Sequence, residues 1–586
     1  MMSPVLVVVH SGGPNRYAAY LQEILDIEGV MGRETLDLAR QDLTAECLDK
    51  RALVILTHLD LAKSQSDLLR RYVSGGGKLV ALRPPLELAD LFGVTRVTPI
   101  IREGYITINP ANPAAARYPV NSLQFHGDGD LYQSVDCQVM AFFAGEFGER
   151  TSYPAIFWKK HSAGGMAAAF AYDLALSTVL FHQGLKEQAS NGRRPDADGD
   201  LAYKPNDLFY RYLDGRLKKI PQADIHQDLL MDLIHQLAPL PLPRIWHFLK
   251  AAPAVALIDG DSDGMRAEAL DKVIAVVEAA GGKYTLYLMI KDFDQLPPAR
   301  MRQLMERGHD FGIHFWQGSR LPSLEVVQKN MQKETQVFFE RYEYSATAHR
   351  GHSVIWVGWT EHAGFLAENG FRLDGNFAAG PGYQEGYING SALPVKFMDE
   401  NGRIINLYEQ ATLSTDDGWA HDKSLLPSKT LGRAMADSLQ QIDDLVLKYH
   451  GVYHPYFHPG PAYQQLAGWP FCTDFWLETV VRYAHRKNML FVNGREWVAF
   501  NDGRRQVRLE KLSWDNEKGL LSCKIKNPSK TEGITIILPL ARDGRVTAPE
   551  LVKGNVEAKT AVLEQCQQLV LLLDGSIQNE ILVHYS

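Results

Sequence analysis

The first ninety residues alternate continuous apolar runs with amphipathic segments. The apolar runs at 5–9, 52–58 and 79–85 predict buried strands, and helical periodicity lies between them. Unbroken apolar strands separated by helices are typical of a parallel sheet that is covered on both faces. The pattern therefore predicts an N-terminal α/β domain, assigned to 1–185, with a doubly wound parallel sheet.

A second and more regular alternation begins near residue 254. Its predicted strands are 254–258, 284–290, 310–316, 344–349 and 371–376. The segments between them have helical periodicity, and repeated βα units of this length build either an open doubly wound sheet or a barrel. We assign this domain to 246–500. Polar residues cluster just after each strand, on the edge where both architectures place their sites.

The remaining segments have different patterns. Residues 186–245 combine a polar Gly- and Pro-rich loop with one helical segment and the rigid run PLPLPR, which predicts a linker. Residues 501–586 contain short strands divided by turn signals and no helical period. This pattern predicts a small C-terminal β-sandwich.

Composition excludes several classes of protein. The net charge of −8 gives no basic field for nucleic acid or an anionic membrane surface. The five cysteines are widely spaced and include no CxxC pair, which suits a reducing compartment. The N-terminal apolar run is too short for a secretory signal or a membrane span, so we expect a cytoplasmic protein; a mature secreted form stays open, and the oligomeric state is not predicted.

The phrase SGGGKLVALRPP at 74–85 resembles the class I glutamine-amidotransferase-like fold. Catalytic members of that family carry a cysteine nucleophile on the tight turn after such a strand. Here the turn holds Arg83, Pro84, Pro85 and Leu86, and no cysteine is near. A thiolate cannot be replaced by these groups. The resemblance therefore implies a non-catalytic scaffold or binding domain.

Ionisable residues follow several strands of the central domain. VALIDGDSDG ends in Asp259, Asp261 and Asp263, and the other groups are GHDFGIHFW, AHRGHS, LDGN and VYHPYFHPG. Three close carboxylates repel one another and resist desolvation, so the first group requires either a wet turn or a positive charge among them.

These motifs together resemble the polysaccharide deacetylases of carbohydrate esterase family 4, over roughly 250–500. LIDGDSD resembles the family's paired aspartates, GHDFGIHFW its histidine motif, Arg350 its arginine and Phe457-His458 its last motif. The resemblance implies a deformed (β/α) barrel. The family's second metal histidine is replaced by Gly318, and RGH resembles a divergent variant in which His352 supplies that ligand.

The resemblance implies a metal-dependent hydrolase that removes an acyl group, such as acetyl, from a carbohydrate. Asp261, His314 and His352 would hold a divalent ion, most simply zinc. Asp259 would accept the proton of the attacking water, and Arg350 would restrain that carboxylate. His458 would protonate the leaving group or stabilise the oxyanion.

Alternatives stay open for several of these residues. Asp263 suits an N-cap of the following helix. His349 competes with His352 as ligand, and His458 could instead buttress a turn. For the whole chain, the alternatives are a catalytically silent carbohydrate-binding or scaffold protein that has lost the metal, and a hydrolase of non-sugar amides.

Overall fold

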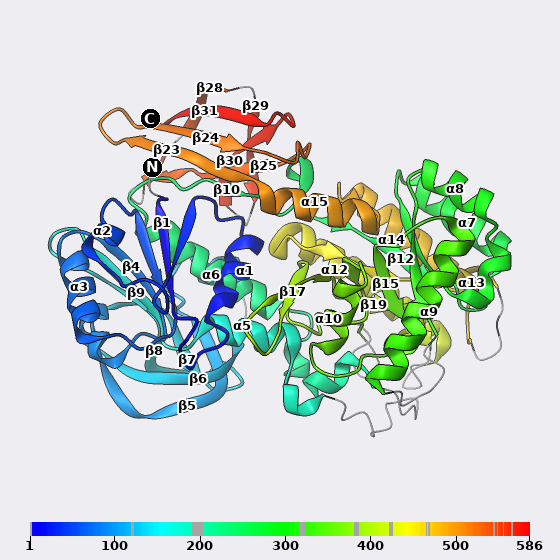
Figure 1. The fold of residues 1–586 in the computed structure, drawn as a ribbon, viewed down its shortest axis with the longest axis horizontal. Helices are drawn as coiled ribbons and strands as arrows, with labels where there is room; N and C mark the ends of the chain where they lie inside the picture. Colours follow the sequence, from blue (N-terminus) through cyan, green and yellow to red (C-terminus); the bar gives the residue numbers. More distant parts are fainter. Residues whose placement is uncertain are drawn as a thin grey trace.

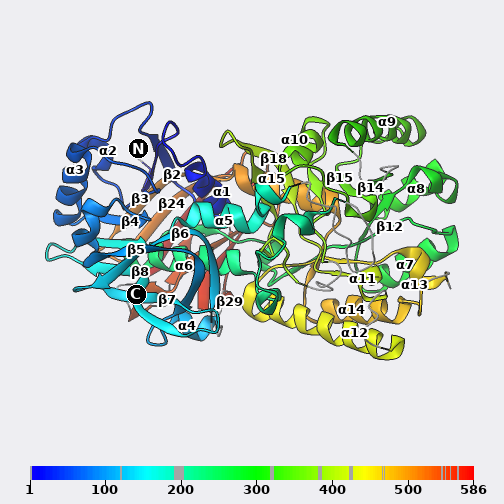
Figure 2. The same cartoon turned by 90° about the horizontal axis from the view of Figure 1, so that it is seen from below.

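The computed structural model describes residues 3–118, 122–189, 203–316, 323–379, 386–420, 426–464, 466, 469–542, 545–547, 549–554, 556–563 and 566–585. The protein is a mixed α/β molecule with several sheets (Figure 1). The N-terminal sheet and the central sheet lie side by side, and the C-terminal strands lie across the N-terminal part (Figures 1 and 2). None of the described helices is both long and apolar enough to cross a membrane.

The N-terminal sheet has nine strands in the order β2-β1-β3-β4-β9-β8-β7-β5-β6. Five are parallel: β1 (Val5–Val9), β2 (Arg33–Asp37), β3 (Leu53–Leu56), β4 (Lys78–Leu82) and β9 (Met166–Phe170). The apolar runs predicted β1, β3 and β4, but not β2 and β9. Helices α1 (Leu21–Ile27), α3 (Lys63–Ser74), α5 (Leu174–Gln183) and α6 (Gln222–Leu237) belong to this part of the chain.

The other four strands extend this sheet in antiparallel fashion, which the parallel pattern did not predict. They are β5 (Val94–Ile108), β6 (Leu123–Ser134), β7 (Gln138–Ala144) and β8 (Arg150–Lys160). Strand β5 has few fully buried positions, so it lacks the continuous apolar run that marks a buried parallel strand. The prediction of a doubly wound parallel sheet therefore holds for the half of the sheet that contains the five parallel strands, and not for the antiparallel half.

The central sheet also has nine strands, in the order β17-β18-β16-β15-β14-β13-β12-β21-β19. Its parallel strands are β12 (Ile258–Asp261), β13 (Tyr284–Leu288), β14 (Asp310–Phe315), β15 (Ala348–Gly351), β16 (Leu373–Asp374), β18 (Ile404–Glu409), β19 (Ser414–Thr415) and β21 (Pro455–Tyr456). Strand β17 (Val395–Met398) pairs antiparallel with β18.

Helices alternate with these strands much as the sequence predicted. They are α7 (Ala267–Ala279), α8 (Pro298–Glu306), α9 (Leu324–Tyr342) and α10 (Glu361–Glu368), followed by α12 (Pro427–Asp444), α14 (Asp474–Arg486) and α15 (Gly494–Gln506). Among the described residues the sheet curls like half a barrel, with β17 and β19 as its edges. The carboxyl ends of its parallel strands therefore face a common space.

The longer C-terminal strands form two antiparallel sheets, as their turn spacing predicted, and β26 (Ala541–Arg542) and β27 (Arg545–Val546) form a separate antiparallel pair. One contains β23 (Arg508–Asp515), β24 (Leu520–Lys526), β31 (Gln578–Tyr585) and β28 (Pro549–Lys553). The other contains β25 (Thr535–Pro539), β30 (Cys566–Leu573) and β29 (Val556–Leu563), and it also takes in β10 (Arg244–Ile245) from before the central sheet. Buried side chains of both sheets share one cluster with Ile27 and Met31.

Candidate active site

Strand β12 carries two carboxylates on one face because side chains alternate along a strand. Asp259 and Asp261 are both buried there, and Gly260 lies between them on the opposite face. A Cβ atom on Gly260 would lie 1.8 Å from the carbonyl oxygen of Phe457 and 2.2 Å from the hydroxyl of Tyr284. Glycine is thus required for β12 to lie close to the chain at Phe457.

Asp259 is held in a closed network of partners. Its Oδ1 and Oδ2 each accept a 3.0 Å hydrogen bond from the guanidinium of Arg350, and Nε2 of His454 lies 2.6 Å from Oδ2. Burial alone would raise the pKa of Asp259, but Arg350 and His454 outweigh it and lower the pKa. Arg350 is itself enclosed between the rings of Tyr287 and Tyr456. Asp259 is therefore an ionised carboxylate whose oxygens are both occupied.

Asp261 is less completely satisfied. Its Oδ1 is buried, accepts no hydrogen bond from the described residues, and lies 3.5 Å from Nη1 of Arg350. Its Oδ2 lies 3.4 Å from Nδ1 of His314. Burial raises the pKa of Asp261, and the charges of His314 and Arg350 offset this only in part. This oxygen can therefore accept a hydrogen bond from a further donor, or bind a cation.

The protonation of His314 follows from its backbone contact. Its Nδ1 lies 2.9 Å from the carbonyl oxygen of Arg350, which can only accept, so Nδ1 carries a proton. Its Nε2 lies 2.9 Å from Oδ2 of Asp263. A neutral ring would direct a lone pair at that oxygen, so the contact is favourable only with a proton or a cation between the two atoms. Burial would lower the pKa of His314, but Asp261 and Asp263 raise it.

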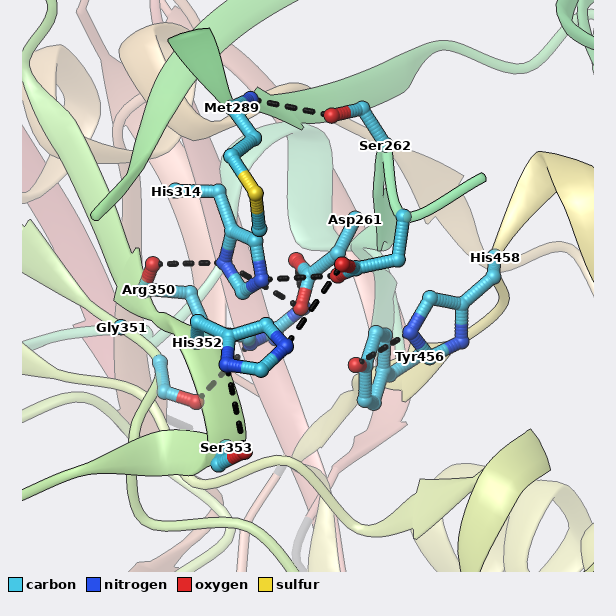
Figure 3. Close-up of polar contacts among 12 residues, drawn as sticks. Asp261, Ser262, Met289, His314, Arg350, Gly351, His352, Ser353, Tyr456 and His458 are labelled. Atoms are coloured by element: carbon cyan, nitrogen blue, oxygen red, sulfur yellow. Dashed lines mark hydrogen bonds and ion pairs between the residues drawn. The ribbon is translucent and has the colours of Figure 1, made fainter. Parts of the chain in front are cut away.

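Asp263 lies in the site and does not cap the next helix. Helix α7 begins at Ala267, and its N-cap position is Arg266. Ser262 fixes the turn before it by accepting a hydrogen bond from the backbone N–H of Met289 (Figure 3). Burial would raise the pKa of Asp263, but the nearby histidines, His314 foremost, lower it well below its usual range.

The structure separates the two histidines that flank Arg350. His349 points to the other face of β15, where its Nδ1 lies 2.6 Å from Oδ1 of Asp374. His352 lies on the site face, with Nε2 3.6 Å from Oδ1 of Asp263. Burial, and then the charge of His314, lower the pKa of His352 to about 4, so its ring is neutral near pH 7 and can donate a lone pair. His352 therefore lies beside the carboxylates, and His349 does not.

His458 approaches the same carboxylates from the opposite side (Figure 3). Its Nδ1 lies 2.8 Å from Oδ1 of Asp416, and its Nε2 lies 2.7 Å from the hydroxyl of Tyr456. Burial would lower the pKa of His458, but the charge and hydrogen bond of Asp416 raise it to about 10. The ring is therefore an imidazolium near pH 7, and Asp416 fixes its orientation.

The whole cluster can accept a divalent cation. Ligand atoms of Asp261, Asp263 and His458 lie within 4.8 Å of one another. His314 and His352 add imidazole nitrogens on the other side of Asp261 (Figure 3). Carboxylate oxygen and imidazole nitrogen are the donors that zinc takes in catalytic sites. The buried Oδ1 of Asp261, which accepts no hydrogen bond from the described residues, fits a cation at this place. A cation could also take the place of the proton between Nε2 of His314 and Asp263.

The six residues singled out from the sequence lie in or directly beside this cluster: Asp259, Asp261, His314, Arg350, His352 and His458. Gly318 lies outside the described residues. Sequence reasoning gave no role to Asp416 or to His454. One signal was available, because His454, Tyr456 and His458 follow one another at the two-residue period of a strand.

The chain matches no protein-family model and none of the curated proteins. A solved structure described as a polysaccharide deacetylase from Mycobacterium smegmatis is 13% identical, covers 44% of this chain and 94% of its own, and has a TM-score of 0.33. A glutamine amidotransferase from Thermotoga maritima is 12% identical, with 41% and 99% coverage and a TM-score of 0.27.

A GH42 β-galactosidase from G. stearothermophilus is 12% identical, with a TM-score of 0.26. That match covers 42% of this chain and 32% of the galactosidase. The first two proteins are of the kinds that the sequence motifs resemble. All three TM-scores are too low to assign an activity, so the roles proposed below rest on the side chains.

Proposed function

We propose that the protein is a metal-dependent hydrolase that removes an acyl group from a carbohydrate. The observation that carries this proposal is the convergence of carboxylates and imidazoles around Asp261, whose buried Oδ1 accepts no hydrogen bond from the described residues. The converging residues are Asp261, Asp263, His314, His352 and His458. Such perturbed, convergent groups mark catalytic sites more often than structural ones.

Asp263, His314 and His352 are the residues we assign to the ion, most simply zinc. The Nε2 atoms of both histidines face Asp263, at 2.9 Å and 3.6 Å from its two oxygens. This assignment differs from the family pattern in using Asp263 in place of Asp261. When bound, a zinc ion lowers the pKa of a water molecule and polarises an acyl carbonyl.

Asp261 is the residue we assign as the general base. Asp259 has both oxygens engaged by Arg350 and His454, whereas Asp261 has a free oxygen and a raised pKa. A raised pKa brings a carboxylate closer to the operating pH and makes it a better proton acceptor. Asp259 then acts by holding Arg350, whose Nη1 is also 3.5 Å from Asp261.

His458 is the residue we assign as the general acid. As an imidazolium held by Asp416, it has a proton to give to the leaving nitrogen or oxygen when the bond to the acyl carbon breaks. Asp261 thus takes a proton from water, and His458 gives a proton to the leaving group. The products are the free acid and the sugar amine or alcohol.

The test combines two measurements on the full chain. We expect isothermal titration with Zn²⁺ to give one tight site, and acetate to be released from N-acetylglucosamine oligomers or acetylated xylan. Asp263→Asn should lose both properties, whereas Asn substitution of the exposed Asp294 should keep both. Absence of divalent-ion binding would favour the catalytically silent alternative. Binding with hydrolysis of simple amides alone would favour the non-sugar alternative.

A further inference from the structure

An open groove of about 640 Å³ lies on the N-terminal part of the molecule, away from the residues proposed for catalysis. Strands β5 and β6 and the turn between β7 and β8 form part of it. Five residues of the segment 211–216, which precedes helix α6, form another part of its wall. None of its lining residues takes part in the proposed reaction.

The groove presents an aromatic ring to solvent. Phe147 has 64% of its surface exposed, which places it among the most exposed large apolar residues of the described chain. The guanidinium of Arg216 covers the ring at 4.2 Å from its centre. Asp214 holds Arg216 through hydrogen bonds from Nε of 2.9 Å and 3.0 Å, and also accepts one from the hydroxyl of Tyr105. The ring and its polar neighbours thus have a defined arrangement.

The polar lining selects the kind of ligand. Carboxylates of Glu103, Glu146 and Asp214 accept hydrogen bonds, while Arg211 and Arg216 donate them. Three carboxylates disfavour an anion, and an apolar ligand would desolvate charged groups without offering them hydrogen bonds. Each carboxylate oxygen can accept a further hydrogen bond besides those that it receives from within the protein. Hydroxyl groups both donate and accept, so a polyhydroxylated neutral ligand can satisfy both kinds of group.

Two residues of the groove have backbone conformations that non-glycine residues seldom adopt. Glu103 has φ of 43° and Arg211 has φ of 54°. The side chain of Glu103 is tied to Nδ1 of His126 at 2.6 Å and to the backbone N–H of Gly127 at 2.7 Å. Strained positions of this kind cluster where proteins hold ligands, because surrounding contacts must maintain them.

The segment 203–218, which includes this wall, also contacts loops of the central part of the molecule. The carbonyl oxygen of Tyr203 accepts a 2.9 Å hydrogen bond from the backbone of Trp356, and that of Lys218 accepts one of 2.8 Å from Tyr387. Phe209 packs against Phe377 at 6.0 Å between ring centres. The wall of the groove is therefore fixed to the part of the molecule that carries the candidate active site.

We propose that this groove is a second, non-catalytic binding site for a neutral saccharide chain. The ring of Phe147 packs against the apolar face of one sugar ring, and the carboxylates and Arg216 bond its hydroxyl groups. The open shape lets a chain pass through. This proposal does not depend on the reaction at the central site.

The experiment measures binding of soluble neutral oligosaccharides to the full chain by titration calorimetry. The probes are hexamers of N-acetylglucosamine, glucose, mannose and xylose. We expect at least one to bind, and Phe147→Ala to weaken that binding about tenfold. Phe475→Ala is the matched control, because Phe475 is 61% exposed and lies outside the groove. It should leave the affinity unchanged.

Glu146→Gln supplies a second variant that keeps the shape of the groove and should weaken the same binding severalfold. His314→Ala separates the two sites, since it should leave groove binding intact even where zinc binding is lost. The proposal is overturned if none of the hexamers binds, or if Phe147→Ala and Phe475→Ala bind alike. It is also overturned if His314→Ala removes all binding.

Discussion

Both nine-stranded sheets of this protein place charged residues at the carboxyl ends of their parallel strands, but in the central sheet one of them, Asp261, has a buried oxygen without a hydrogen-bond partner among the described residues. In the N-terminal sheet, Arg83 follows β4 and its Nε donates to Asp130 at 2.9 Å. Asp173 follows β9, where it caps α5 through the N–H of Ala175 and accepts a hydrogen bond from Asn15. These groups have partners within their own sheet.

In the central sheet, Asp263 has His314 and Lys291 as partners, but Oδ1 of the neighbouring Asp261 is buried and accepts no hydrogen bond from the described residues. Polar residues at strand ends are therefore not enough to identify a functional site. What distinguishes the central site is buried charge that requires a further ligand. The following variants test this difference.

The largest effect is expected from His314→Ala. This change removes the imidazole that faces Asp263, so zinc affinity should fall by at least about 100-fold, and hydrolysis should fall with it. Titration calorimetry with Zn²⁺ measures the first effect without relying on activity. His309→Ala is the control, because His309 lies at the start of the same strand and pairs with Glu278 away from the site.

If His314→Ala and His309→Ala bind zinc equally well, the contact between His314 and Asp263 is an ordinary ion pair. The charged residues at the central strand ends would then be paired within the protein, as those of the N-terminal sheet are.

The next largest effects distinguish the roles of the two carboxylates of β12. Asp261→Asn should keep the fold but reduce turnover about 100- to 10,000-fold, because it removes the proposed base. Asp259→Asn should instead destabilise the protein by about 3–5 kcal/mol, because it leaves the buried Arg350 without its bidentate partner. Thermal unfolding and acetate release measure the two effects.

The opposite result would restore Asp259 as the base: a stable but inactive Asp259→Asn together with an active Asp261→Asn. This outcome is decisive because both substitutions replace one oxygen by an amide nitrogen and change the size of the side chain little.

A smaller effect concerns pH. Hydrolysis should rise as Asp261 ionises and fall as His458 loses its proton near its pKa of about 10. Asp416→Asn removes the charge that favours the imidazolium, so the pKa of His458 should fall and the alkaline limb of the profile should move to lower pH. The acid limb, which belongs to Asp261, should move much less. An unchanged alkaline limb would contradict the role of His458.

Much of the central fold could be predicted from the sequence, because its strands are short, apolar and regularly separated by helices. Strands β13 and β14 and helices α7, α8 and α9 lie within a few residues of their predicted positions. The antiparallel strands β5–β8 were not predicted. Strand β7 holds an apolar run that could have indicated it, but β5 is exposed or half-buried along most of its length. A half-exposed strand is difficult to distinguish from a loop in a single sequence.

The sequence predicted which strand ends carry the residues of the candidate site. It did not predict which of those residues contact one another. His454 pairs with Asp259 across 195 positions, and only the adjacency of β12 and β21 brings them together. Asp263 was expected to cap a helix because it precedes one, but the turn at Ser262 directs it towards His314. Pairing of this kind depends on the three-dimensional order of strands, which local pattern does not contain.

The smallest expected effect is a loss of stability caused by a substitution in the N-terminal sheet. Arg83→Gln removes the main partner of Asp130, which is largely buried, and leaves it only the 3.5 Å contact with Arg96. The free energy of unfolding should fall by about 2–3 kcal/mol, as expected for an incompletely compensated carboxylate. Arg102→Gln is the exposed control and should change it by less than about 0.5 kcal/mol. Zinc binding and hydrolysis should be unchanged in both. A loss of either in Arg83→Gln, with stability intact, would mean that the N-terminal strand ends serve the central site as well as their own sheet.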